Sequence, residues 1–232
     1  MGLKAQYDNY YQSSLIKKTF PNIELRGWPR DRVEAIIFAI SPGETVLDVG
    51  CGNGGLLYQL RHHYKKLIGL EFSPHRLEQA KVNLSELSFM PILGSAENMS
   101  EVTTNSIDCV VSADTIEHIP DVYAATQEIY RVLRKGGTLI INTPNIAFVK
   151  KRLLLLFGRF PATAQNNEGL GGDILFDSGH LHYFTFRSLQ LLLKRYGFEI
   201  QCCMGYGIFG RIHNLYPALM SGGVQVIARK PI

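Results

Sequence analysis

An aspartate and several glycines share one short stretch of the sequence, VLDVGCGNGG at residues 46–55. Gly50, Gly52 and Gly55 have the spacing of a dinucleotide-binding loop, in which backbone amides and a helix N-terminus hold a pyrophosphate. Asp48 fits that interpretation badly, because its negative charge would face two phosphates in a partly dry pocket. A ligand that carries positive charge and no phosphate suits this stretch better.

A second carboxylate, Glu71, ends the next apolar segment, about twenty residues after the first glycine. At that position a carboxylate can accept hydrogen bonds from both hydroxyls of a ribose. Proteins that bind NAD share this feature, so Asp48 is the residue that separates the two classes of ligand. S-adenosylmethionine carries a sulfonium and an ammonium and no phosphate, and therefore suits Asp48.

The segments that must position these residues alternate between two patterns. Four apolar runs rich in β-branched residues predict buried strands, with a weaker strand at 89–94. Helical patterns lie between them, including 55–64 and a helix that Ser73 caps. This alternation predicts an α/β fold with a doubly wound, mostly parallel, seven-stranded Rossmann-like sheet, an antiparallel last strand and helices on both faces. The four clearest strands are expected at 45–50, 66–71, 107–112 and 137–143.

Composition indicates an ordinary globular chain of 232 residues, 46% hydrophobic and 19% charged, with a net charge of +4. That charge is mild and no block of like charges occurs, so we expect no nucleic-acid partner. No apolar run reaches the roughly 18 residues of a membrane span, and the first residues lack a signal-peptide core, so we expect a cytoplasmic protein without membrane insertion. A homodimer is one option for its assembly. The cysteines show no CxxC spacing and favour a reducing compartment: Cys51, Cys109, Cys202 and Cys203.

Five motifs occur in an order and spacing that resemble class I S-adenosylmethionine-dependent methyltransferases of the small-molecule type. They are VLDVGCGNGG, LIGLEFS, GSAEN, IDCVVSADTIEHIPD and EIYRVLRKGGTLIINTPN. The similarity covers residues 30–145 and, by pattern, the closing strands. It implies S-adenosyl-L-methionine as cofactor, S-adenosyl-L-homocysteine as product and an enzyme of the EC 2.1.1 class.

The resemblance also implies which residues bind the cofactor. Asp48 and the amides near Gly50 would hold the methionine part, and Glu71 the ribose. Many relatives have aspartate where this chain has Ser95, and Glu97 could equally cap a helix. The expected cofactor-binding residues are Asp48, Gly50, Cys51, Gly52, Gly54, Glu71, Phe72, Ser95, Ala96, Glu97 and Asp114.

Histidines follow the strand ends on the acceptor side. Methyl transfer from a sulfonium needs a base only when the acceptor arrives protonated, and histidine suits that task near neutral pH. The candidate catalytic residues are His118, His180 and His182, of which His182 is expected to face the substrate, with loop tethering as its alternative. We therefore expect a small-molecule acceptor methylated at oxygen. The alternatives are an NAD(P)-dependent oxidoreductase and a non-catalytic S-adenosylmethionine-binding module.

Asp114, Glu117 and His118 form a D-x-x-E-H pattern. It is similar to the E-x-x-E-H ligand set of some metal-assisted class I methyltransferases, in which a further histidine completes the shell. The same EHIP turn is common in relatives without a metal. The sequence therefore favours Glu117 and His118 as residues that orient the loop, and no metal ligand is expected.

We expect one methyltransferase domain over residues 1–232, divided into four parts. N-terminal cap helices occupy 1–43, the cofactor-binding core 44–143, a lid or acceptor insertion 144–184, and a closing helix and strands 185–232. In the insertion, three basic residues followed by four leucines predict an amphipathic helix. This helix is interpreted as an apolar wall of the lid, as a helix packed on the core, or as a membrane contact.

Overall fold

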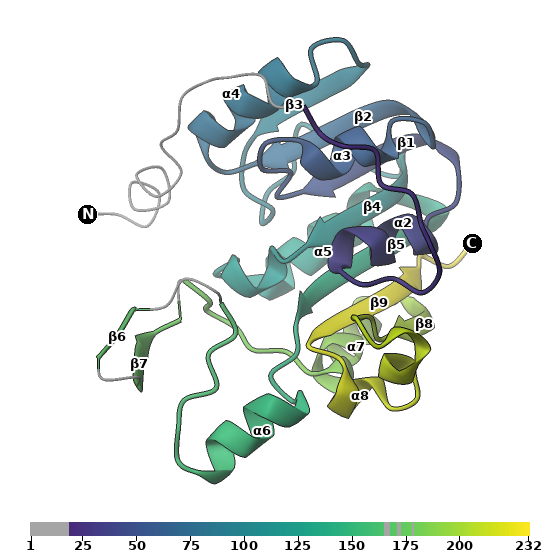
Figure 1. The fold of residues 1–232 in the computed structure, drawn as a ribbon. Coiled ribbons are helices and arrows are strands. Elements are labelled where there is room, and N and C mark those ends of the chain that lie inside the picture. The colour runs from purple at the N-terminus through teal and green to yellow at the C-terminus, as the bar shows by residue number, and fades with distance from the viewer. Residues whose placement is uncertain (1–18, 165–167, 171–172, 178) are drawn as a thin grey trace.

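The computed structural model describes residues 19–232 except 165–167, 171–172 and 178. A seven-stranded sheet crosses the molecule in the order β3-β2-β1-β4-β5-β9-β8 (Figure 1). Strand β9 runs antiparallel to both of its neighbours, β5 and β8, and the other pairs are parallel. The predicted fold class is confirmed. The strands are β1 (Gly43–Val49), β2 (Tyr64–Glu71), β3 (Phe89–Leu93), β4 (Ile107–Ala113), β5 (Leu133–Pro144), β8 (Glu199–Met204) and β9 (Gly223–Arg229).

Helices cover both faces of this sheet, each over its own apolar core. Leu47, Val110 and Leu139, from three central strands, are fully buried, as continuous apolar runs between two helical layers must be. The core on one face includes residues of α2 (Arg32–Ala39), α3 (Gly55–Leu60) and α4 (Pro74–Asn83). The core on the other face includes residues of α5 (Val122–Val132) and α7 (Phe186–Arg195).

Local sequence signals set the helix ends. The Ser73 hydroxyl accepts a hydrogen bond from the Arg76 amide at the start of α4, which confirms the predicted cap. The pattern over 55–64 predicts a longer helix than α3, which ends at Leu60. The prediction fails there because Tyr64 already begins β2, and its buried ring donates a hydrogen bond from its hydroxyl to the Ser41 carbonyl.

Between β5 and α7 the chain leaves the sheet. It forms helix α6 (Val149–Leu156) and the antiparallel pair β6 (Glu168–Leu170) and β7 (Asp173–Phe176). Helix α6 stands away from the sheet in Figure 1, and none of its 8 residues, all of them described, is buried. The predicted helix is confirmed, and the interpretation of a helix packed on the core is wrong. Among the described helices, none has the length and apolar character needed to cross a membrane.

The remaining segments frame the carboxyl ends of the strands. A 3₁₀ turn, η1 (Ile116–His118), follows β4, and η2 (Gly210–Asn214) and α8 (Pro217–Met220) lie between β8 and β9. Of the expected N-terminal cap helices, α2 is present, whereas residues 1–18 lie outside the described part of the chain. The cysteines are unpaired, with Cys51 and Cys109 buried and Cys202 exposed on β8.

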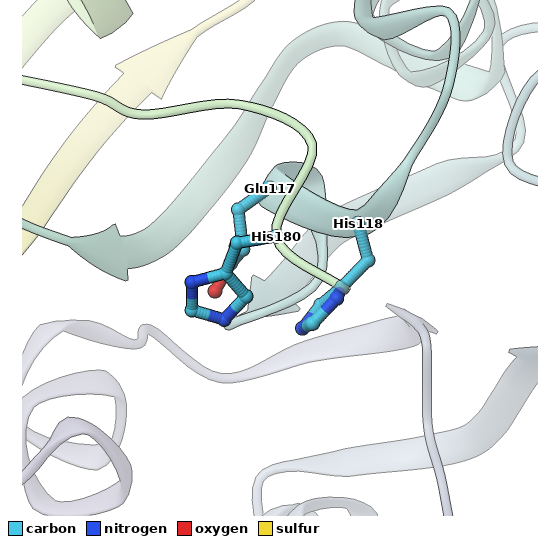
Figure 2. A group of neighbouring side chains, drawn as sticks. All are labelled: Glu117, His118 and His180. Atoms are coloured by element: carbon cyan, nitrogen blue, oxygen red, sulfur yellow. The ribbon is translucent and has the colours of Figure 1, made fainter. Parts of the chain in front are cut away.

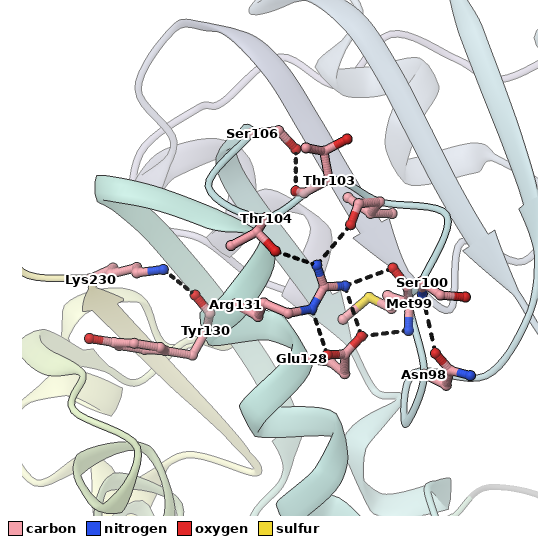
Figure 3. A network of polar contacts seen from close by, with 11 residues as sticks. Asn98, Met99, Ser100, Thr103, Thr104, Ser106, Glu128, Tyr130, Arg131 and Lys230 are labelled. Atoms are coloured by element: carbon pink, nitrogen blue, oxygen red, sulfur yellow. Dashed lines mark hydrogen bonds and ion pairs between the residues drawn. The ribbon is translucent and has the colours of Figure 1, made fainter.

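A polar network fastens α5 to the loop between β3 and β4 (Figure 3). The Arg131 guanidinium donates to the carbonyls of Met99 and Val102 at 2.8 and 2.9 Å. It also pairs with Glu128, whose carboxylate accepts from the Met99 amide at 2.7 Å. Because charge-assisted bonds to backbone groups hold this loop, the segment that follows Ser95 is fixed against the helix.

Candidate active site

The carboxyl ends of β1 and β2 bring Asp48 and Glu71 together in the protein interior. Asp48 is 2% exposed, and its Oδ1 has no hydrogen-bond partner among the described residues. Glu71 accepts hydrogen bonds from the amides of Gly52 and Ser73, at 2.8 and 2.9 Å. Burial and the Glu71 charge raise the pKa of Asp48 to about 7, against the lowering effect of the Arg76 guanidinium. A cationic ligand group would favour the ionised form of Asp48.

The loop after β1 needs glycine for two separate reasons. Gly50, Gly52 and Gly54 have φ values of +82°, +56° and +83°, in the left-handed region. In addition, a Cβ on Gly50 would lie 2.4 Å from Thr115 Oγ1, and one on Gly52 would lie 2.3 Å from an Arg76 guanidinium nitrogen. The loop therefore packs against both η1 and the start of α4.

Arg76 and Cys51 complete the surroundings of this loop. The sequence did not single out Arg76, because nothing in its spacing shows that its side chain turns back over Gly52. The Cys51 sulfur lies 2.6 Å from the position of a Cβ on Gly69 in β2, so the thiol fills space beside that strand. Burial, followed by the charges of Asp48 and Glu71, raises the pKa of the Cys51 thiol, which keeps it protonated.

The residues expected beside adenine follow β2 and β3. Phe72 is 42% exposed, and Ala96 is buried. The Ser95 hydroxyl donates to Glu97 Oε2 at 2.7 Å, and the Asp121 amide at the start of α5 donates to Glu97 Oε1 at 2.8 Å. Glu97 thus holds the beginning of a helix, as its alternative interpretation proposed, and its contact with adenine stays a prediction.

Asp114 follows β4 with a φ of +48°, unusual for a residue with a side chain. Its Oδ2 lies 2.8 Å from Arg32 Nη1 of α2. Burial raises the pKa of Asp114, and the Arg32 guanidinium and His118 oppose that shift. Burial and the Asp114 charge also raise the pKa of the Tyr206 hydroxyl. Arg32 and Tyr206 escaped the sequence analysis because both come from segments distant from residue 114.

Glu117 and two histidines gather at the turn η1, as Figure 2 shows. One potential ligand atom from each of Glu117, His118 and His180 lies within 4.8 Å of the other two. The ring centroids of His118 and His180 are 4.6 Å apart. Burial and the Asp114 charge raise the pKa of Glu117 to about 8, and burial lowers the pKa of both histidines. This group can hold a proton or a metal cation.

His182 lies outside this group. Its Nε2 is 3.2 Å from the Pro120 carbonyl, and its backbone amide donates to the Glu117 carbonyl. Of the three histidines predicted to be catalytic, the structure brings His118 and His180 together. The contacts of His182 are those of a residue that tethers the loop, the alternative that the sequence left open.

Comparison with known proteins finds that the chain is similar to methyltransferases. The family model described as a methyltransferase domain matches residues 47–141. The ubiquinone biosynthesis O-methyltransferase of Xanthomonas oryzae pv. oryzae is 28% identical over 152 residues, which cover 59% of this chain and 63% of that protein. The chain thus matches less than two thirds of this curated relative's length.

Solved structures share the fold at low identity. A possible histamine N-methyltransferase from Thermotoga maritima is 22% identical, with a TM-score of 0.61 and coverage of 85% of this chain and 87% of that one. The [4+2]-cyclase SpnF is 17% identical, with a TM-score of 0.63 and coverage of 91% and 89%. These structures show that the chain shares their fold, and the domain match shows that residues 47–141 are similar to a methyltransferase domain.

Proposed function

We propose that this protein transfers a methyl group from S-adenosyl-L-methionine to an oxygen atom of a small-molecule acceptor. The observation that carries the cofactor is the buried Asp48 carboxylate, whose Oδ1 has no partner in the described part of the chain. An unsatisfied buried carboxylate is costly, and the ammonium or sulfonium of the cofactor would compensate for it. The residues present therefore fit this ligand, whereas a pyrophosphate would meet two acidic side chains.

When bound, S-adenosylmethionine supplies a methyl group on a positively charged sulfur leaving group. The protein's part is to hold donor and acceptor in line. Asp48 would orient the methionine part, and Glu71, fixed by two backbone amides, would take the ribose hydroxyls. The left-handed glycines let the ligand approach the backbone closely. Arg76 lies over Gly52 and partly balances the acidic pair.

Two observations support oxygen as the methylated atom. The similar proteins from Xanthomonas are named ubiquinone biosynthesis O-methyltransferases, although the match covers only part of their length. On the acceptor side, burial lowers the pKa of His118 and His180, so neutral imidazoles face this region at physiological pH. Their lone pairs can serve an acceptor hydroxyl, either directly as bases or as ligands of a cation.

Calorimetric titration of the purified protein with S-adenosylhomocysteine and with NAD⁺ tests the cofactor. We expect the nucleoside to bind and NAD⁺ not to bind. Asp48→Asn should weaken cofactor binding at least about tenfold, since the fixed negative charge is lost. Glu44→Gln, an exposed carboxylate on the same strand as Asp48, is the matched control and should leave the affinity unchanged.

Two results would overturn this proposal. Equal affinity of wild type and Asp48→Asn would remove the role of the carboxylate, and NAD⁺ binding without cofactor binding would favour an oxidoreductase. The transfer itself is tested with radiolabelled methyl donor and a panel of hydroxylated acceptors. Tight cofactor binding with no labelled product on any acceptor would indicate a non-catalytic binding module.

A further inference from the structure

We propose that Glu117, His118 and His180 bind one divalent transition-metal ion, and that an oxygen of the methyl acceptor completes its coordination. The metal site stands on the geometry of these three residues alone (Figure 2). Only the identity of the additional oxygen ligand rests on the proposed function. The sequence favoured a loop-orienting role for Glu117 and His118, since the same EHIP turn is common in relatives without a metal.

Glu117 is the residue that most needs a cation. It is 1% exposed, and its Oε2 accepts a hydrogen bond from Thr143 Oγ1 at 3.0 Å. Its other oxygen, Oε1, is buried without a hydrogen-bond partner among the residues that the structure describes. Thr143 thus occupies Oε2 and leaves the lone pairs of Oε1 unused, and one oxygen of this carboxylate lies within 4.8 Å of a ring nitrogen of each histidine. A metal ion would satisfy it and offset the cost of burial.

The hydrogen bonds around His180 determine which nitrogen can bind a metal. Thr163 Oγ1 donates to Asp177 Oδ2 at 2.9 Å and lies 2.6 Å from His180 Nδ1. Since the Thr163 hydroxyl has one proton and gives it to Asp177, it can only accept from His180, so Nδ1 carries the ring proton. Nε2 then carries the lone pair. Carboxylate-supported imidazoles of this kind are typical of metal ligands.

His118 is oriented in the same way by the backbone. Its Nδ1 lies 3.1 Å from the Gly179 carbonyl, which can only accept, so this nitrogen is also the protonated one in the neutral ring. The lone pair is therefore on Nε2. Figure 2 shows both rings directed into the space beside the Glu117 carboxylate. Two imidazoles and one carboxylate thus converge with tautomers suited to one ion.

The donor set indicates the class of metal. Imidazole nitrogens with one carboxylate suit Zn²⁺, Mn²⁺, Fe²⁺ or Co²⁺ better than Mg²⁺ or Ca²⁺, which prefer oxygen ligands. Three protein ligands leave coordination positions open, and one carboxylate leaves a net positive charge that favours an anionic oxygen. Thr115, two residues before Glu117, packs on Gly50 of the cofactor loop. The turn that carries Glu117 and His118 therefore borders the expected place of the methyl donor.

Metal binding to the chelator-treated, full-length protein tests the proposal. Titration calorimetry with Zn²⁺, Mn²⁺ and Mg²⁺ should give one site, with Zn²⁺ the tightest and Mg²⁺ the weakest. Glu117→Gln and His180→Gln should each weaken Zn²⁺ binding at least about tenfold. His62→Gln, an exposed histidine before β2, is the matched control and should bind as wild type does. Visible absorption of the Co²⁺ form reports the ligand set independently of activity.

The outcomes separate this inference from the proposed function. Glu117→Gln should retain wild-type affinity for S-adenosylhomocysteine, which also shows that the variant is folded, while it loses the metal. Equal Zn²⁺ affinity in wild type, Glu117→Gln and His180→Gln would overturn the site, as would the absence of binding in wild type. Asp48→Asn should lose cofactor binding and keep its Zn²⁺ affinity. This result would support both the cofactor site and the metal site, and would show that the two sites bind independently.

Discussion

Arg32 Nη1 lies 2.8 Å from Asp114 Oδ2, so a helix near the N-terminal end of the described chain is held at the carboxyl end of β4. The two side chains are 50% and 27% exposed. A pair this accessible contributes little to folding stability. The pair instead determines where α2 lies, because it fixes this helix beside the turn that carries Glu117 and His118.

Arg32→Met should therefore affect the acceptor more than the fold. The free energy of unfolding should fall by no more than about 1 kcal/mol, since water screens the pair. The KM for the acceptor should rise, because the pair fixes α2 beside the turn that carries Glu117 and His118, and the cofactor Kd should change less. Steady-state kinetics and calorimetry measure the two effects, with Arg26→Met, which removes a more exposed pair with Glu24, as the control. A raised cofactor Kd with unchanged acceptor KM would contradict this assignment.

Asp48 makes stability and cofactor affinity depend on pH in opposite directions. Its pKa is raised from 3.8 to about 7 in the folded protein, chiefly by burial. The folded state therefore holds this proton more tightly than the unfolded chain does. Its contribution to stability is complete below pH 3.8 and is lost as pH rises through about 7. Under the proposed function, cofactor binding requires the ionised carboxylate, so the affinity for the cofactor should increase over the same rise in pH.

Asp48→Asn isolates this effect from the other titrating groups. Denaturant unfolding should show that wild type loses stability as the pH rises from 3.8 to about 7. The variant should lack the part of this loss that comes from Asp48. Calorimetry of wild type near pH 6 in two buffers of different ionisation enthalpy should detect a proton released on cofactor binding. Identical pH profiles of variant and wild type would refute the assignment.

Alanine substitutions at Gly50 and Gly158 distinguish the cost of backbone strain from the cost of a steric clash. Both have positive φ, +82° and +69°. Gly158→Ala should cost about 1 kcal/mol, because a Cβ there meets no heavy atom within 4 Å in the described part of the chain. Gly50→Ala should cost clearly more and weaken cofactor binding, since the new Cβ would displace Thr115. Chemical denaturation and calorimetry provide both values, and equal costs would show that the Thr115 contact yields freely.

Arg131→Met should destabilise the fold, because Arg131 ties α5 to the loop between β3 and β4. It removes hydrogen bonds to the Met99 and Val102 carbonyls and the pair with Glu128, so we expect a loss of about 1–3 kcal/mol in the free energy of unfolding. Lys81→Met, which removes an exposed pair with Glu78, should cost at most about 0.5 kcal/mol. Denaturant unfolding measures both variants. An Arg131 variant as stable as the Lys81 variant would contradict the role of the network.

The sheet was predictable because its signals are local. Apolar β-branched runs bounded by turn residues marked the strands, and Ser73 marked a helix start. Boundaries failed where two patterns overlap, as at Tyr64, which continues a helical period and yet begins β2. Packing in the interior decided that position, and no short window of sequence contains this information.

The acceptor side was predictable only as a list of residue types. Glu117 and His180 stand 63 positions apart, and Arg32 reaches Asp114 across 82. Sequence spacing cannot show which of several histidines meets a given carboxylate, because the insertion after β5 can return along many paths. His182 looked the more promising by its aromatic neighbours, yet His180 is the one that joins His118.

The distribution of thiols gives this chain a ready labelling scheme. Cys51 and Cys109 lie in the interior, where burial suppresses ionisation, and Cys202 stands exposed on the edge strand β8. A maleimide fluorophore under brief, mild treatment should therefore attach first at that strand. A dye placed there reports on the edge of the sheet while the thiol beneath the glycine loop stays unmodified.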